Sequence, residues 1–289
     1  MNKEIFKIVY MPNGLKMMSV EPINETGIAE AYITIKDNPM GCSKGYCGPL
    51  SSNIYKPLGR EEGINDFKLC CESMGISYTD VITNRLIAFT DIVRDVDEKD
   101  LEGYDIFDEP SAPRADGLIT ESNKITLMNY AADCAIIMFL DKKYKIAGIL
   151  HAAWKGSLLG IIEAEVEAFR KKTNNNIDNL IAVMMPSISL DCFEVGDDCA
   201  EQFVAAGYKD FVDFENYTKP HVDLAGVNKS ILLKCGINPE NIYSTNEYCT
   251  YKNADLFHSY RRGPVGENNI HYNGMNGYFI KLKPDSSIN

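Results

Sequence analysis

A cysteine and a histidine stand at the two ends of a segment with the pattern of a β-hairpin. Cys134 precedes the apolar run AIIMFL, and His151 follows a second run, KIAGIL, with the charged residues DKKY between the two. If Lys142 and Lys143 are the central residues of a tight turn, Cys134 lies directly opposite His151. Opposed side chains share one face of a sheet, with Cβ atoms about 4.5–5.5 Å apart. The pattern therefore predicts a thiol beside an imidazole, which suits nucleophilic catalysis or a shared metal ion.

This prediction depends on the register of the hairpin. A slip of one residue would send the two side chains to opposite faces of the sheet. Other interpretations of both residues are open. Cys134 can be a buried free cysteine, the commoner fate of this residue type, and His151 can be a strand-end histidine bonded to backbone.

His151 also begins the motif HAAWKGS, which leads into a predicted helix over residues 157–172. Ser157 suits the N-cap of that helix, and the free N–H groups of a first helical turn favour an anion. Lys155 adds a positive charge, so the sequence predicts a phosphate position beside His151. The adjacent arginines that end at Arg262 can clamp a phosphate or form surface ion pairs, and the sequence leaves both open.

The small number of histidines limits the metal chemistry. The chain has four, at positions 151, 221, 258 and 271, and no HxH pair. Multicopper oxidation needs several imidazole-rich sites, and a single blue-copper centre already takes two histidines and a cysteine. The sequence therefore argues against a laccase in the chemical sense.

Composition narrows the class of protein further. The 289 residues carry a formal net charge of −12, which argues against a nucleic-acid or anionic-membrane partner. Nine cysteines form an odd set without a regular framework, which indicates reduced thiols and a cytoplasmic protein. The N-terminal residues show no apolar signal-peptide region and no membrane span.

Periodicity gives a coarse order of elements. Several predicted strands are neighbours in sequence, so an α+β fold of mixed sheets is favoured over a doubly wound parallel sheet. We expect a single domain over residues 1–289, with a tail from about 283. The predicted strands are at 5–10, 15–20 and 81–96, together with the two hairpin strands, and a long loop is expected at 37–62. The predicted helices are at 64–74, 157–172, 197–206 and 223–235, and each of the last two begins with an Asp suited to capping.

Seven segments of the chain resemble, in order and spacing, the laccase-domain or polyphenol oxidase family. They are DGLIT (116–120), AADC (131–134), HAAWKG (151–156), MPSISLDCFEVG (185–196), VDLAGVNKSIL (222–232), CGINPENIY (235–243) and CTYKNADLFHSYRR (249–262). The match runs through most of residues 30–282, and the A-D-C and H-A-x-W-[RK]-G boxes are specific at this separation. Members are regarded as zinc-dependent purine nucleoside phosphorylases, some with adenosine deaminase and methylthioadenosine phosphorylase activity.

The resemblance implies a fold and a site. The fold is one of mixed β-sheets sandwiched by helices, related to the cytotoxic necrotizing factor deamidases. The site holds a zinc ion on one cysteine and two histidines, and these positions include Cys134 and His151. The resemblance also places Asn53 and Lys36 among the substrate-binding positions, to which the motifs above add Lys155 and Arg262.

The chain departs from the family pattern at several of these positions. The first ligand histidine of the family falls on Ala88, which leaves two of three protein ligands for zinc. The family arginine of the F-T-T-R element falls on Lys36. His258 replaces an aromatic position, and a third nitrogen from this residue is an open alternative.

Three functions follow from these observations. The first is a purine nucleoside phosphorylase, which takes a purine nucleoside and phosphate to the base and ribose 1-phosphate. The second is a metal-free hydrolase or deamidase, with Cys134 as nucleophile and His151 as base. The third is a divergent binding paralogue without catalysis.

Overall fold

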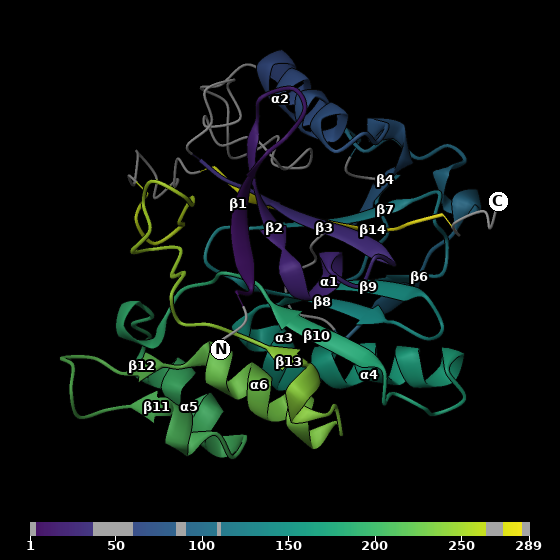
Figure 1. The fold of residues 1–289 in the computed structure, drawn as a ribbon. Helices are drawn as coiled ribbons and strands as arrows, with labels where there is room; N and C mark the ends of the chain where they lie inside the picture. Colours follow the sequence, from purple (N-terminus) through teal and green to yellow (C-terminus); the bar gives the residue numbers. More distant parts are fainter. Residues whose placement is uncertain (1–3, 37–59, 85–90, 109–110, 264–273, 285–289) are drawn as a thin grey trace.

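The computed structural model describes residues 4–36, 60–84, 91–108, 111–263 and 274–284. Within these residues the elements form layers, with two six-stranded sheets face to face and helices on their outer faces (Figure 1). The main apolar cluster between the sheets contains Leu127 and Tyr278 from one sheet and Ile136 and Ile149 from the other. This arrangement confirms the prediction of an α+β fold of mixed sheets sandwiched by helices.

The first sheet contains the N-terminal strands and the last strand of the chain. Its order is β1-β2-β3-β14-β7-β4, and all neighbours are antiparallel except β4 and β7. The strands at 5–10 and 15–20 were thus correctly predicted. The bounds are β1 Phe6–Tyr10, β2 Lys16–Val20, β3 Ala29–Thr34, β4 Val81–Thr83, β7 Thr126–Ala131 and β14 Asn276–Leu282.

The second sheet contains the predicted hairpin. Its order is β13-β10-β8-β9-β6-β5, with β5 parallel to β6 and β10 parallel to β13. A separate two-stranded sheet pairs β11 (Val212–Asp213) with β12 (His221–Val222). The bounds of the large sheet are β5 Val93–Asp95, β6 Gly117–Thr120, β8 Ala135–Asp141, β9 Ile146–Ala152, β10 Leu180–Met184 and β13 Ile242–Tyr243.

The helices cover the outer faces of the sheets. Helix α2 packs Phe67 and Cys71 against Met128 and Phe279 on the first sheet. On the second sheet, Phe169 of α4 packs against Phe139 of β8. The bounds are α1 Glu21–Asn24, α2 Arg60–Ser73, α3 Trp154–Leu159, α4 Ile161–Lys172, α5 Asp197–Ala205 and α6 Leu224–Lys234, with 3₁₀ turns η2 Tyr78–Asp80, η3 Glu98–Leu101, η5 Leu190–Cys192, η6 Lys209–Phe211 and η7 Pro239–Asn241. None of the helices in the described ranges has the length and apolarity that a bilayer crossing requires.

The hairpin forms, but its register differs by two residues from the prediction. His151 lies opposite Ile136 rather than Cys134. The turn is longer than two residues: Lys142–Lys145 connect the strands, and Oδ1 of Asp141 accepts the N–H groups of Lys143 and Tyr144 at 2.9 and 2.8 Å. A shift of two residues keeps side chains on the same face because side chains alternate with a period of two. The predicted shared face is therefore retained.

Four local predictions were wrong. The apolar stretch 81–96 is not one strand, because β4 and β5 belong to different sheets. The helix expected at 157–172 begins at Trp154 and is broken at Gly160, whose φ of 93° is in the left-handed region that glycine tolerates. Ser157 therefore does not cap the helix, and α5 begins after Gly196 without a side-chain cap. Asp223 does cap α6, accepting the N–H of Gly226 at 2.9 Å.

One carboxyl group is buried on the outer face of the second sheet. Glu165 of α4 is 0% exposed, and neither of its carboxylate oxygens has a hydrogen-bond partner among the described residues. Its oxygens lie over Gly117 of β6 and Gly148 of β9, where a β-carbon at either position would collide with them. Burial raises the pKa of Glu165 well above its ordinary value, because a charged carboxylate is poorly solvated there.

Glu165 should make stability depend on pH. Its pKa is raised in the native state, so its stabilising contribution is complete below the unfolded-state pKa of about 4.3 and is lost as pH rises above that value. We expect Glu165→Gln, which cannot ionise, to remove a slope of up to about 1.4 kcal/mol per pH unit from the free energy of unfolding. Urea unfolding between pH 5 and pH 8 checks this. Glu167→Gln, an exposed change on the same helix, is the control, and identical slopes for wild type and Glu165→Gln would contradict the assignment.

A candidate active site between the two sheets

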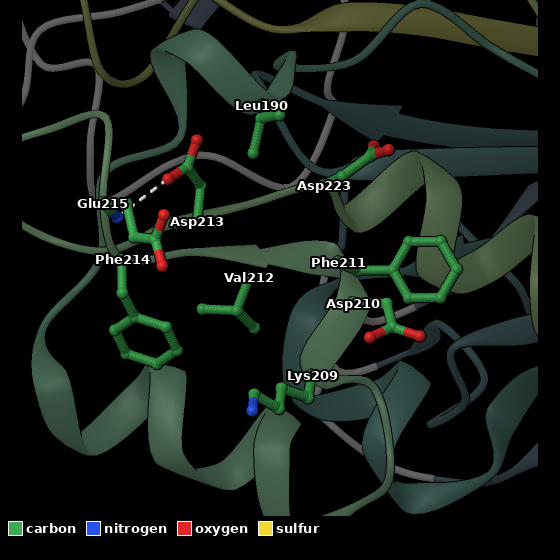
Figure 2. Close-up of a pocket in the computed structure, with 9 residues that line it drawn as sticks. All are labelled: Leu190, Lys209, Asp210, Phe211, Val212, Asp213, Phe214, Glu215 and Asp223. Atoms are coloured by element: carbon green, nitrogen blue, oxygen red, sulfur yellow. Dashed lines mark hydrogen bonds between the residues drawn. The ribbon is translucent and has the colours of Figure 1, made fainter.

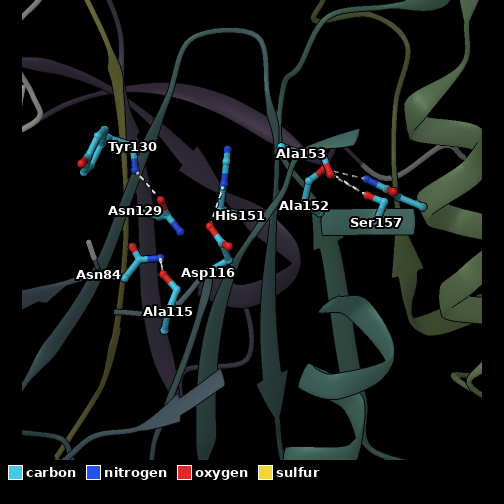
Figure 3. Close-up of polar contacts among 10 residues, drawn as sticks. Asn84, Ala115, Asp116, Asn129, Tyr130, His151, Ala152, Ala153 and Ser157 are labelled. Carbon is cyan, nitrogen blue, oxygen red and sulfur yellow. Dashed lines mark hydrogen bonds and ion pairs between the residues drawn. The ribbon is translucent and has the colours of Figure 1, made fainter. Parts of the chain in front are cut away.

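Two adjacent strands of the second sheet bring a carboxylate to a histidine. Asp116 directly precedes β6, and His151 lies near the end of β9. The N–H of His151 donates to the carbonyl of Asp116 at 2.8 Å, which extends the strand pairing by one residue. The side chains point to the same face, where Nδ1 of His151 lies 3.2 Å from Oδ1 of Asp116 (Figure 3). Both residues are buried, with 5% and 1% of their surface exposed.

Cys134 is the third member of this group. It precedes β8 and packs against the apolar cluster between the sheets, and its side chain interacts with the imidazole of His151, whose pKa it raises. Since Nδ1 of His151 faces Asp116, Nε2 is the nitrogen available to the thiol. Cys134 is a free cysteine and is partly exposed, whereas His151 is buried.

The electrostatics of this group favour a protonated imidazole. Burial lowers the pKa of His151, but hydrogen bonds to Asp116 and Cys134 and the charges of those two groups raise it, with a net result of about 9. A carboxylate behind Nδ1 fixes the orientation of the ring and stabilises its charged form. The order Cys134, His151, Asp116 is the order of nucleophile, base and orienting group in cysteine-based catalytic sites.

Two buried amides from the first sheet lie in the same region (Figure 3). Asn84 follows β4 and stands beside Asn129 of β7, because Thr83 pairs with Met128. Asn84 joins the two sheets by donating from Nδ2 to the carbonyl of Ala115 at 2.7 Å. Within the described residues, Oδ1 of Asn84 and Nδ2 of Asn129 have no hydrogen-bond partner. Such atoms commonly bind water or a ligand, so they mark this space as polar.

Asp133 organises the chain around Cys134. Its φ is 87°, an unusual conformation for a residue other than glycine. The residue is 8% exposed. Its carboxylate accepts the hydroxyl of Thr250 at 2.6 Å, the hydroxyl of Ser259 at 2.9 Å and the N–H of Arg261 at 2.7 Å. Its carbonyl accepts the N–H of Ile188 at 3.1 Å. Asp133 therefore ties two loops, residues 185–192 and residues 249–262, to the position beside Cys134.

Two of the predicted substrate-binding residues, Lys36 and Arg262, have contacts with the 249–262 loop. Lys36 follows β3, and its Nζ lies 3.4 Å from the carbonyl of Ala254. The guanidinium of Arg262 donates to the carbonyls of Thr250, Tyr251 and Phe257, so it holds this loop in its fold. Contact of either side chain with a phosphate stays a prediction.

The other predicted positions are less closely tied to this group. Lys155 is exposed on α3, with its Nζ 5.2 Å from the centre of the Trp154 ring. His258 is held through its backbone, whose N–H and carbonyl both bond the side-chain amide of Asn276 at 2.9 Å. Asn53 and Ala88 lie outside the described residues. The roles predicted for these four positions remain predictions.

The donor set fits a zinc ion only in part. Cys134 and His151 supply a thiol and an imidazole, and Asp116 bonds the second ring nitrogen as carboxylates commonly do behind a metal-bound histidine. No group of three His, Cys, Asp or Glu side chains with ligand geometry occurs in the part of the chain that the structure describes. Ala88, at the third family position, has no donor atom in its side chain. Catalytic zinc usually has three protein ligands, so two alone do not complete the site.

A separate hollow lies beside the small two-stranded sheet (Figure 2). It has a volume of about 360 Å³ and is rich in carboxylates. One of these, Asp213, already accepts the N–H groups of Glu215 and Asn216 at 2.9 and 3.0 Å. None of the predicted site residues that the structure describes lines the hollow. It is formed by Leu190, Lys209, Asp210, Phe211, Val212, Asp213, Phe214, Glu215 and Asp223.

Reasoning from the sequence missed Asp116 and Asp133 as parts of the site. Both lie in segments with a family resemblance, DGLIT and AADC, and both place a charge next to an apolar strand. A charged residue at the head of a buried strand needs a partner, and this was the available signal. The partners themselves come from distant parts of the chain, so spacing could not identify them.

Comparison with known proteins gives the same fold and a family. Residues 59–274 match the family described as multi-copper polyphenol oxidoreductase laccase. The solved structure of the hypothetical protein YfiH from Bacillus licheniformis superposes with a TM-score of 0.79 at 23% identity, covering 97% of this chain and 100% of that one. YlmD from Geobacillus stearothermophilus superposes with a TM-score of 0.77 at 22% identity, covering 98% and 100%.

Curated relatives match over a shorter stretch. An "adenosine deaminase RL5" from an unknown prokaryotic organism is 33% identical over 171 residues, 58% of this chain and 64% of that protein. The "purine nucleoside phosphorylase YlmD" of Bacillus subtilis is 31% identical over 149 residues, 51% and 53% of the two chains. The mouse "purine nucleoside phosphorylase LACC1" is 31% identical over 150 residues, 51% and 35%. The matches thus span between about a third and two thirds of these relatives. Because the family match over residues 59–274 covers well over half of this chain, the chain belongs to the multi-copper polyphenol oxidoreductase laccase family.

Proposed function

We propose that this protein is a purine nucleoside phosphorylase-like enzyme with His151, Asp116 and Cys134 at its reacting centre. The observation that carries the proposal is the buried hydrogen bond between His151 and Asp116, with the partly exposed residue Cys134 also interacting with the imidazole. Relatives at about 31% identity carry the name purine nucleoside phosphorylase, which supports this substrate class.

Phosphorolysis of a purine nucleoside requires a proton donor at the leaving purine and cations that bind phosphate. In phosphorolysis, a phosphate oxygen bonds C1′ of the ribose while the bond from C1′ to the purine nitrogen breaks. The leaving purine takes up negative charge, so a positioned proton donor lowers the barrier. His151, held in one orientation by Asp116, is placed to donate this proton. Lys36, Lys155 and Arg262 are the cations proposed to bind phosphate, with Asn53 as a further substrate contact.

The proposed reaction does not require a bound zinc ion. When bound, a zinc ion would stabilise negative charge on the leaving group. The two donors Cys134 and His151 do not complete a catalytic zinc site, so the steps above are assigned to the protein's own side chains.

Phosphate-dependent release of base tests the proposal. We expect purified protein to convert inosine or adenosine to base and ribose 1-phosphate when phosphate is present, with and without added zinc. His151→Gln and Cys134→Ser should each lower the rate by about 100-fold or more, because they remove groups that act at the reacting atoms. Chromatography of the base and an enzymatic assay for ribose 1-phosphate provide the measurement. Cys235→Ser, a partly buried thiol on the far side of the second sheet, is the matched control.

The result separates the alternatives. Wild-type protein that gives no ribose 1-phosphate under either metal condition would contradict the proposal. Nucleoside binding without turnover, measured by calorimetry, would support a binding paralogue instead.

A metal-free hydrolase or deamidase is the second candidate, favoured by the order Cys134, His151, Asp116. This is the arrangement of a thiol nucleophile, its base and the group that orients the base. One relative carries the name adenosine deaminase, which is consistent with hydrolytic chemistry in the family.

Alkylation of Cys134 distinguishes this second candidate. In chelator-treated protein at neutral pH, iodoacetamide should modify Cys134 at least tenfold faster than Cys235, whose pKa burial raises to about 11. Peptide mass spectrometry over a time course measures both rates. His151→Gln should remove the difference by taking away the base. Equal rates at Cys134 and Cys235 in the wild type would rule out a thiolate nucleophile.

A further inference from the structure

Two further cysteines lie in contact, away from the group around His151. Cys192 ends the 3₁₀ turn Leu190–Cys192 in the 185–192 loop, and Cys249 begins the 249–262 loop. A parallel bridge pairs Cys249 with Ser187, and the N–H of Thr250 donates to the carbonyl of Ser187 at 3.1 Å. The loops therefore run side by side. The N–H of Cys192 donates to the carbonyl of Ser189 at 2.9 Å, and the N–H of Ser189 donates to Sγ of Cys249 at 3.4 Å, so the two cysteines lie on either side of Ser189 and their side chains interact. Both cysteines are free.

The sulfur of Cys249 is surrounded by hydrogen-bond donors. The N–H of Ser189 lies 3.4 Å from its Sγ, and the backbone N–H groups of Tyr251 and Lys252 also contact it. Burial raises the pKa of Cys249, but hydrogen bonds from the surrounding donors outweigh burial and leave the pKa lowered. Donors of this kind stabilise a thiolate over a thiol.

The surroundings of Cys192 shift its pKa in the opposite direction. Burial and the neighbouring Cys249 and Asp191 raise its pKa. Lys252 forms an ion pair with Asp191 beside it. The pair thus combines one thiol whose pKa is lowered with a neighbour whose pKa is raised, which is the division of roles between an attacking and a resolving cysteine.

A cavity adjoins Cys249, although this residue is only 3% exposed. Cys249 lines a cavity of about 610 Å³ together with Ser187, Ser189, Asp191 and Lys252. Cys192 is partly exposed. Cys199 and Cys235, in contrast, have pKa values that burial raises to about 11, so they are ordinary unreactive thiols.

We propose that Cys192 and Cys249 form an oxidant-sensitive dithiol that hydrogen peroxide converts to a disulfide. The Cys249 thiolate attacks one peroxide oxygen: an S–O bond forms, the O–O bond breaks, and the departing hydroxide is protonated to water. The Cys192 thiol then attacks the Cys249 sulfur. The S–S bond forms, the S–OH bond breaks, and hydroxide leaves with the Cys192 proton as water. Two electrons pass from the sulfurs to the peroxide.

The location gives the modification a structural consequence. Both loops are held by Asp133, the residue before Cys134, through its bonds to Ile188, Thr250 and Ser259. A disulfide would join the same two loops covalently. Oxidation would therefore hold the 185–192 loop and the 249–262 loop in one arrangement beside Asp133. This consequence does not depend on which reaction the protein performs.

Limited oxidation of the whole protein tests the proposal. Reduced protein is treated with an equimolar amount of hydrogen peroxide, free thiols are alkylated, and peptides are identified by mass spectrometry. We expect a Cys192–Cys249 disulfide as the main product. In Cys192→Ser, Cys249 should instead accumulate as a sulfenic acid that dimedone traps, because the resolving thiol is absent. Cys249→Ser should give neither product.

Matched variants keep the outcome clear. Cys235→Ser should form the Cys192–Cys249 disulfide like the wild type, and circular dichroism of each variant confirms folding. Oxidation that falls equally on Cys199 and Cys235, or that leaves Cys192 and Cys249 unlinked in the folded wild type, would overturn the proposal. The readout is independent of nucleoside turnover, so failure of the phosphorylase assay does not affect it.

Discussion

The buried hydrogen bond between Asp116 and His151 is the interaction on which the site depends. A carboxylate and an imidazole in the space between two apolar sheets lose most of their hydration, and only close pairing compensates for that loss. Replacement of one partner leaves the other buried and unpaired, which is costly. The pairing requires β6 and β9 to be neighbours in their present register, so the order of strands in the second sheet fixes the chemistry.

The loops around this pair are organised from one residue. Asp133 adopts a backbone conformation that few non-glycine residues use, and its carboxylate accepts three hydrogen bonds from the 249–262 loop. Such conformations persist where surrounding contacts hold them, and they concentrate at functional sites. The strand that carries Cys134 is thus connected to the loop that contains Arg262, and through Ile188 to the loop that contains Cys192.

The sequence predicted those features that depend on local pattern. Alternation of apolar runs gave the hairpin and the shared face of Cys134 and His151, and the face was retained because the register error was two residues. The error arose because Asp141 organises a longer turn, which composition does not reveal. The pairing of His151 with Asp116 depends on a contact 35 residues apart in sequence, and strand order beyond a hairpin is not encoded in periodicity. The pairing of Asp133 with Thr250 could not be predicted for the same reason.

Nitrogen-15 NMR of histidine-labelled protein tests the central interaction most directly, since only four histidines contribute. His151 is assigned by the signal that disappears in His151→Gln. We predict that at neutral pH its Nδ1 carries a proton, protected from exchange and coupled to a hydrogen bond, and that Asp116→Asn shifts this signal and abolishes the protection. A His151 ring that is neutral, with its proton on Nε2 and in rapid exchange with water, would contradict the pairing.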